Sequence, residues 1–322
     1  MDPKRIFKVV EEDFSAVNQL ILDQLHSDVD LVETISQYLV DSGGKRIRPL
    51  LVLLAAKTCN YQGKDHVLLA TIIEFLHTAT LLHDDVVDMS ELRRGRSTAN
   101  AVFGNAPSVL VGDFLYSRAF QMLVQLADLP IMAIMANCTN QIAEGEVQQL
   151  TNARNPDLNE QEYREVIQAK TAILFEAAAE SAGILCDVSP EQQTALKNYG
   201  AHLGMTFQLI DDLLDYDGEA EEMGKNVGDD LAEGKMTLPL IRTLENSSET
   251  DATLIREAVL KNRPEHAATI ISLVKNSDAL SYTLEKAEFE AEQAIQQLEK
   301  LPDNHYRDAL RDLAKQALNR SK

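Results

Sequence analysis

Apolar residues recur along almost the whole chain at the three- to four-residue spacing of an amphipathic helix. Strand-like alternation bounded by turns is hard to find. The pattern therefore predicts an all-α protein with helices over residues 5–26, 28–41, 48–60, 64–89, 107–127, 130–153, 159–185, 190–216, 236–245, 251–261, 263–275, 278–299 and 303–319.

The central helices are apolar nearly all round, as in LLVLLAAKTC and TIIEFLHTATLL, and helices of this kind lie inside a protein. The C-terminal helices are more amphipathic and belong at its periphery. No stretch has the composition of a flexible linker, and no repeat of solenoid length is present. We therefore expect one large domain over residues 1–322.

Composition narrows the function classes. Asp and Glu (51) outnumber Lys and Arg (30), so the formal net charge is −21, which opposes binding to nucleic acid. Any anionic ligand must then meet a local cluster of cations or a metal. The three cysteines form no CxxC pair, as is typical of a protein of the reducing cytosol without a zinc site. A charged N-terminus and the absence of an apolar run of about 18 residues predict a cytoplasmic protein without a signal peptide or transmembrane segment.

A group of three aspartates interrupts one of the apolar helices. In HDDVVDMS these are Asp84, Asp85 and Asp88. On an ideal helix Asp84 and Asp88 lie about 40° apart, and His77 and Thr80 continue the same stripe towards the N-terminus. His77 is therefore a candidate ligand, although a histidine on an apolar helix is more often a core residue.

A second group repeats the spacing. In FQLIDDLLDYDG it comprises Asp211, Asp212 and Asp215, and Gln208 lies one turn earlier on the same face. Carboxylates crowded on a buried face repel one another and lose hydration unless a cation neutralises them. Oxygen ligands of this kind suit Mg²⁺, which binds through a few carboxylates together with substrate phosphate. One such motif in an acidic protein is most often a solvated helix end, but two copies inside apolar helices predict a magnesium site.

Cations accompany both aspartate groups. Residues 43–49 read GGKRIRP and place Lys45, Arg46 and Arg48 in a glycine-containing loop that leads into a helix, where backbone N–H groups and the helix dipole favour a phosphate. The other candidate cations are Arg93, Arg94, Lys170, Lys225 and Lys235. Each one alone would most often be a surface counter-charge. Their grouping around glycine turns favours phosphate binding.

In order and spacing these motifs resemble those of the trans-isoprenyl diphosphate synthases, the polyprenyl synthetases. The resemblance covers essentially the whole chain and rests on GGKRIRP at 43–49, HDDVVDMSELRRG at 83–95, GDFLYSRAF at 112–120, the pair Lys170-Thr171, FQLIDDLLDY at 207–216 and GKNVGDDLAEGKMTLPL at 224–240. It implies a single bundle of mostly antiparallel helices around a deep apolar cavity, with the two DDxxD motifs facing each other at its mouth.

The resemblance also implies roles for the candidate residues. Three Mg²⁺ ions would be held by Asp84, Asp85, Asp88, Asp211, Asp212 and Asp215. The allylic diphosphate would contact Arg93, Lys170, Thr171, Gln208, Lys225 and Lys235, among which Arg93, Lys170 and Lys235 would assist catalysis. Isopentenyl diphosphate would contact Lys45, Arg48, His77 and Arg94.

The implied reaction needs no protein nucleophile. The allylic C–O bond ionises, the double bond of isopentenyl diphosphate attacks the cation, and loss of a proton gives a product five carbons longer. The family also implies a homodimer, for which the apolar stripe near residues 107–127 is a candidate interface, and transient membrane contact during product release is possible.

The expected product is longer than geranylgeranyl diphosphate, with an octaprenyl chain for quinone biosynthesis made from farnesyl diphosphate as the favoured case. Ala79 and Thr80, just before the first aspartates, are small, and in the family aromatic residues at these positions accompany short products. Met122 and Met135 are candidates for the cavity floor, although a methionine on an apolar helix is as often a core gap-filler.

Four alternatives remain open: a synthase of another product length, a terpene cyclase, a non-catalytic partner subunit and an acidic calcium-binding protein. A cyclase has no second diphosphate substrate and no need for GGKRIRP, a partner subunit would lose ligands that are present here, and the EF-hand spacing is absent. His83 is left unassigned. Glu144 and Glu146 are either neighbours of the site or part of a solvated face.

Overall fold

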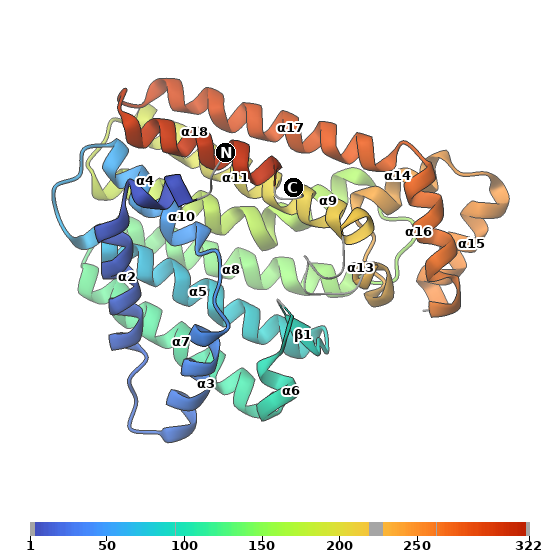
Figure 1. Ribbon diagram of the computed structural model, residues 1–322, viewed down its shortest axis with the longest axis horizontal. Helices are drawn as coiled ribbons and strands as arrows, with labels where there is room; N and C mark the ends of the chain where they lie inside the picture. The colour runs from blue at the N-terminus through green and yellow to red at the C-terminus, as the bar shows by residue number, and fades with distance from the viewer. Residues whose placement is uncertain (1–3, 94, 219–227, 262, 320–322) are drawn as a thin grey trace. The chain divides into compact units, whose positions relative to one another are not determined.

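The computed structural model describes residues 4–93, 95–218, 228–261 and 263–319, and nearly all of them are helical (Figure 1). The all-α prediction is confirmed. The chain separates into two compact units. Unit 1 comprises Met1–Cys138, Leu174–Gly200 and Ile295–Leu313, and unit 2 comprises Thr139–Ile173, Ala201–Ala294 and Ala314–Lys322. The expectation of one domain over the whole chain stays a prediction.

The first half of the chain contains α1 (Lys4–Lys8), α2 (Glu11–Gln24), α3 (Asp30–Asp41), α4 (Ile47–Thr58), α5 (Asp65–Val87), β1 (Leu92–Arg93), β2 (Arg96–Ser97), α6 (Ala99–Phe103), α7 (Asn105–Leu126) and α8 (Leu129–Asn152). The second half contains α9 (Glu160–Ile167), the π-helix η1 (Gln168–Ala172), α10 (Ile173–Leu185), α11 (Pro190–Asp217), α13 (Asp229–Glu233), α14 (Leu238–Asn246), α15 (Glu249–Lys261), the 3₁₀-helix η2 (Pro264–His266), α16 (Ala267–Asn276), α17 (Ala279–Gln297), the 3₁₀-helix η3 (Leu298–Lys300) and α18 (His305–Leu318).

Each predicted helix has a counterpart within a few residues, but two are interrupted. The helix expected over 5–26 is divided into α1 and α2. Acidic residues open α2, where the positive end of the helix dipole favours them, and the Phe7 and Phe14 rings pack edge to face across the break, 5.0 Å apart. The helix expected over 159–185 contains the π-helix η1. The short hairpin of β1 and β2 was not predicted.

The core of unit 1 surrounds α5, which packs against α2, α4 and α7 (Figure 1). Every residue from Pro49 to Ala56 in α4 is buried, as expected for a helix that is apolar on all sides. By length and composition α5 could cross a membrane, but 56% of its most apolar window is buried. Its burial among neighbouring helices is that of a core helix.

Unit 2 has an apolar core of its own, formed by α9, α11 and the helices from α14 to α17. Leu209 from α11, Ile241 from α14, Ile255 from α15 and Ile270 from α16 are all buried in it. Polar contacts add to this packing, because Arg164 Nη1 on α9 lies 2.8 Å from Glu290 Oε1 on α17. The core thus fixes α9 and the end of α11 within the same unit.

Gly200 on α11 marks a close approach of backbones within unit 1. A Cβ atom at Gly200 would lie 2.8 Å from the carbonyl carbon of Phe175 on α10, whereas one at Gly183 would meet Leu196 Cδ1, also at 2.8 Å. Backbone atoms cannot rotate away, but the end of a leucine side chain can. We expect Gly200→Ala to lower the free energy of unfolding by about 1–3 kcal/mol and Gly183→Ala by less than ~1 kcal/mol. Denaturant unfolding of both variants checks this, and equal losses would contradict the close approach.

Candidate active site

The first aspartate group ends α5 in unit 1. Asp85 is buried and Asp88 is the C-terminal cap of the helix. This end carries the negative pole of the helix dipole, so three carboxylates there are unfavourable without a cation. Arg93 supplies one, since its Nε and Nη2 atoms donate to Asp85 Oδ1 at 2.9 and 2.7 Å. Burial opposes the Arg93 charge, but the hydrogen bond to Asp85 and the charges of Asp84 and Asp88 raise the pKa of Arg93 overall.

The β1–β2 hairpin is what returns Arg93 to the helix end. Ser90 N donates to Asp85 O at 2.9 Å, and Thr98 Oγ1 donates to Ser90 O at 2.7 Å. The side-chain amide of Asn100 donates to both of these carbonyl oxygens at 3.1 Å. The hairpin is therefore fastened to the last turn of α5. Arg94, which was predicted to bind isopentenyl diphosphate, lies outside the described residues.

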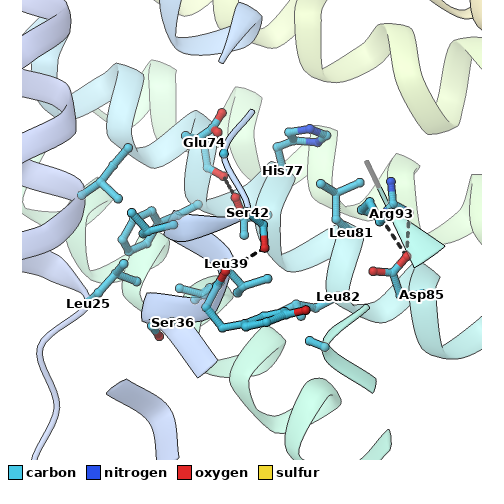
Figure 2. Close-up of a pocket in the computed structure, with 18 of the residues that line it drawn as sticks. Leu25, Ser36, Leu39, Ser42, Glu74, His77, Leu81, Leu82, Asp85 and Arg93 are labelled. Atoms are coloured by element: carbon cyan, nitrogen blue, oxygen red, sulfur yellow. Dashed lines mark hydrogen bonds and ion pairs between the residues drawn. The ribbon is translucent and has the colours of Figure 1, made fainter. Parts of the chain in front are cut away.

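A cavity in unit 1 lies beside this helix end (Figure 2). It contains about 870 Å³ of empty space, part of which is open to solvent. Polar residues from three separate motifs line it: Gly43, Arg46, His77, Asp85 and Arg93. Its apolar walls include Leu25, Leu39, Phe75, Leu81, Leu82 and Leu115. The structure thus brings the GGKRIRP loop, the histidine and the first aspartate group to one amphipathic cavity.

His77 and Arg48 contact each other directly. Arg48 Nη1 lies 3.1 Å from His77 Nε2, and the guanidinium lies 4.3 Å from the centroid of the Phe175 ring. Because arginine only donates, His77 Nε2 is the acceptor in this contact. Lys45 is exposed and lines a neighbouring groove with Phe7 rather than this cavity.

The four candidate chain-length residues do not line this cavity. Ala79, Met122 and Met135 are fully buried, and Thr80 Oγ1 donates to His77 O at 2.8 Å. The cavity follows instead the face of α5 that carries Thr78. The predicted product path past Ala79 stays a prediction.

The second aspartate group lies near the end of α11 in unit 2, and both Asp212 and Asp215 are buried. Gln208 Nε2 donates to Asp212 Oδ1 at 2.7 Å, and Tyr163 Oη donates to Oδ2 at 2.5 Å. Thr171 Oγ1 in turn donates to Gln208 Oε1 at 2.9 Å. Burial, followed by the charge of Asp230, raises the pKa of Asp212 to about 8, against the opposing hydrogen bonds of Tyr163 and Gln208.

Tyr163 is a site residue that sequence reasoning missed. It is buried on α9, and its hydroxyl group lies 49 positions away from Asp212 in the sequence. The heptad-like spacing of EYREVI marks Tyr163 only as a core residue. Nothing in the sequence signals its hydrogen bond.

Two further candidate cations of unit 2, Lys170 and Lys235, are paired with carboxylates. Lys170 Nζ lies 2.9 Å from Glu146 Oε2, and Lys235 Nζ lies 2.6 Å from Glu233 Oε2. Glu146 is therefore a neighbour of a candidate site residue. Glu144 is exposed, as expected for a residue of a solvated face. Lys225 lies outside the described residues.

No three carboxylate, imidazole or thiol groups within residues 4–93, 95–218, 228–261 and 263–319 converge closely enough to hold a metal ion by themselves. Mg²⁺ commonly takes one or two protein carboxylates and completes its shell with water and substrate phosphate. The half-buried carboxylates of Asp84, Asp88 and Asp211 fit that donor set.

Comparisons with known proteins agree on the family. The polyprenyl synthetase model matches residues 29–276. Octaprenyl diphosphate synthase of Escherichia coli (strain K12) is 49% identical over 100% of both chains. An all-trans-nonaprenyl-diphosphate synthase (geranyl-diphosphate specific) of Rhodobacter capsulatus is 46% identical over 98% of this chain and 97% of its own.

Solved structures give the same picture. A polyprenyl synthase from Caulobacter crescentus CB15, complexed with calcium and isoprenyl diphosphate, has a TM-score of 0.96 and 41% identity over 100% of this chain and 98% of its own. A decaprenyl diphosphate synthase from Rhodobacter capsulatus has a TM-score of 0.94 and 42% identity over 100% of both chains.

The raised pKa of Asp212 predicts a pH dependence of stability. The folded-state value of about 8 lies above the ordinary 3.8, so the contribution of Asp212 is complete below pH 4 and is lost as the pH rises through 8. For the metal-free protein we expect the free energy of unfolding to fall by about 1 kcal/mol per pH unit between pH 5 and pH 8. Asp212→Asn should remove this slope in chelator-treated samples. An unchanged slope in the variant would assign it to other groups.

Proposed function

The chain belongs to the polyprenyl synthetase family, and we propose that it condenses farnesyl diphosphate with successive isopentenyl diphosphate units to form octaprenyl diphosphate for a quinone side chain. It is a prenyltransferase with the all-α isoprenoid synthase fold. The observation that carries the proposal is the cavity that joins Gly43, Arg46 and His77 to the Asp85–Arg93 pair. A phosphate loop beside an aspartate group is what a two-diphosphate reaction needs and a terpene cyclase does not.

Isopentenyl diphosphate is assigned to the start of α4. Arg48, next to His77, and the exposed Lys45 supply positive charge, and the N-terminus of the 12-residue α4 adds its dipole. Gly43 adopts φ 65°, in the left-handed region that glycine favours. These features support a diphosphate at this loop.

The allylic diphosphate is assigned to Arg93, Lys170 and Lys235. These cations stabilise the negative charge that develops on the leaving diphosphate as the C–O bond ionises. Asp85 orients Arg93 in unit 1, and Thr171 and Gln208 orient Asp212 in unit 2.

Mg²⁺ would be held by carboxylates of the two aspartate groups, of which Asp84, Asp88 and Asp211 have half-buried side chains. When bound, it supplies a Lewis acid for the diphosphate. The number of three ions per site is part of the proposal, as is the participation of Asp85, Asp212 and Asp215. Calcium in the Caulobacter crescentus polyprenyl synthase structure supports the use of a divalent ion.

Carbon–carbon bond formation uses no protein nucleophile. The double bond of isopentenyl diphosphate attacks the allylic cation, and the released diphosphate takes the proton that is lost. Apolar walls such as Leu81 and Leu82 exclude water from the cation.

An octaprenyl product is supported by the small, buried Ala79 and by the octaprenyl diphosphate synthases of Escherichia coli (strain K12) and Haemophilus influenzae, at 49% and 48% identity. The nonaprenyl and decaprenyl synthases are almost as similar, at 46% and 42%. Identity alone therefore does not select the length.

We also propose a homodimer in the cytoplasm. On α7, Leu110 and Val124 are each 66% exposed and Val109 is 36% exposed, which suits an interface between two copies. Transient contact with a membrane would allow the apolar product to leave the protein without entering water. A non-catalytic partner subunit is disfavoured, because such a subunit would lack the metal and phosphate ligands that this chain retains.

Incubation with farnesyl diphosphate, labelled isopentenyl diphosphate and Mg²⁺ tests the function. We expect labelled long-chain products from the native protein and a loss of at least ~100-fold in turnover for Asp84→Ala and Asp211→Ala. The thermal midpoint of either metal-free variant should stay level or rise, because carboxylate repulsion is relieved. No incorporation by the native protein would exclude elongation, and near-native turnover of both variants would exclude the aspartate assignment.

Product length tests the path past Ala79. Ala79→Tyr places a bulky ring one turn before Asp84 and should shorten the product by several isoprene units, as read by reverse-phase chromatography. Thr78→Tyr is the matched control, because Thr78 lines the cavity on another face of α5. If Thr78→Tyr shortens the product and Ala79→Tyr does not, the chain grows along that cavity instead.

A further inference from the structure

Lys170 lies on an unusual piece of backbone. Residues Gln168–Ala172 form the π-helix η1, and the N–H group of Ile173 donates to the carbonyl of Gln168, five residues earlier. A π-turn holds one more residue than an α-turn and is favourable only when its surroundings stabilise it, which is why such turns gather at functional sites. Both Lys170 and Thr171 lie on this π-helical segment.

Helix α8 supplies those surroundings through a glycine. A Cβ atom at Gly145 would lie 2.9 Å from Ala169 Cβ and 3.2 Å from Lys170 N, so only glycine lets the α8 backbone approach η1 this closely. The next residue, Glu146, then reaches Lys170, with 2.9 Å between Glu146 Oε2 and Lys170 Nζ. The two side chains are 28% and 21% exposed, respectively, so water screens the pair only in part.

The position of Glu146 has a chemical consequence. The ammonium of Lys170 is the counter-ion of this carboxylate and also the proposed ligand of the allylic diphosphate. A diphosphate that binds Lys170 comes close to a fixed negative charge and competes with it for the same donor. Glu146 must therefore weaken the hold of Lys170 on diphosphate.

We propose that Glu146 is a positioning residue that holds Lys170 between catalytic cycles and promotes release of the inorganic diphosphate product. The inference rests on the proposed function, because it takes Lys170 as a diphosphate ligand. In each cycle the ammonium turns from Glu146 to the diphosphate and returns to Glu146 as that product leaves. The ligand concerned is a diphosphate group, free or esterified.

Glu146→Gln tests the inference because it keeps the shape of the side chain and removes its charge. Titration calorimetry of the full-length variant with inorganic diphosphate, in Mg²⁺ buffer, should show a dissociation constant about two- to fivefold lower than that of the native protein. The KM for the allylic diphosphate should fall in parallel, without a rise in kcat. A purely structural defect would weaken binding, so tighter binding separates the two explanations.

Glu144→Gln is the matched control. Glu144 lies on the same helix, is exposed, and accepts a hydrogen bond from Asn140 at 2.9 Å instead of facing Lys170. It should leave the diphosphate affinity unchanged. In a Lys170→Met background, Glu146→Gln should also lose its effect, because the competition requires the ammonium.

Three results would overturn the inference, and each points to a different error. If Lys170→Met weakens diphosphate binding but Glu146→Gln leaves it unchanged or weaker, Lys170 is a ligand and Glu146 only a structural neighbour. If Lys170→Met does not weaken binding, the assignment of Lys170 in the proposed function is wrong. If Glu144→Gln and Glu146→Gln lower the dissociation constant for diphosphate equally, the effect comes from the net charge of the protein and not from the Glu146–Lys170 pair.

Discussion

The structure depends on the neutralisation of carboxylates gathered near the C-terminal ends of two long helices. Asp85 near the end of α5 and Asp212 near the end of α11 are buried where the helix dipole and low dielectric both oppose negative charge. Their partners differ, and those of Asp212 only partly offset the burial that raises its pKa. Arg93 brings a positive charge to Asp85, whereas Tyr163 and Gln208 bring neutral donors to Asp212. Asp215, which is also buried, accepts a hydrogen bond from Asp230 N at 3.3 Å.

The same constraint governs the cations. Lys170 and Lys235 are proposed to bind diphosphate, yet each is paired with a glutamate. The chain has a net charge of −21, and an anion must still be attracted to this site. Pairing each lysine with a glutamate lowers the free energy of keeping positive charges close together there. In the proposed function the pairs would also limit how tightly diphosphate is held, which suits an enzyme that releases diphosphate once per added isoprene unit.

Helix α5 organises unit 1 because its faces have different tasks. The side chains that line the amphipathic cavity in Figure 2 include His77, Leu81, Leu82 and Asp85. Ala79 is buried in the protein interior. A helix this apolar tolerates polar residues only where each has a partner, as Thr80 and His77 do. Side chains that line the cavity and side chains that pack in the core thus project at different angles from a single helix.

The sequence by itself determined the helices and the chemistry of the site. Helical periodicity located nearly every helix, and the two DDxxD motifs with GGKRIRP indicated carboxylates for a metal and cations for phosphate, because these features are local. Only the tertiary structure decided which groups meet. Arg93 reaches Asp85 through an unpredicted hairpin, and Tyr163 reaches Asp212 from another helix. Lys170 reaches Glu146 because a glycine lets α8 approach a π-turn. Periodicity reports which face of a helix is buried, but a hydrogen bond between distant segments depends on how their backbones pack, and no single segment encodes that.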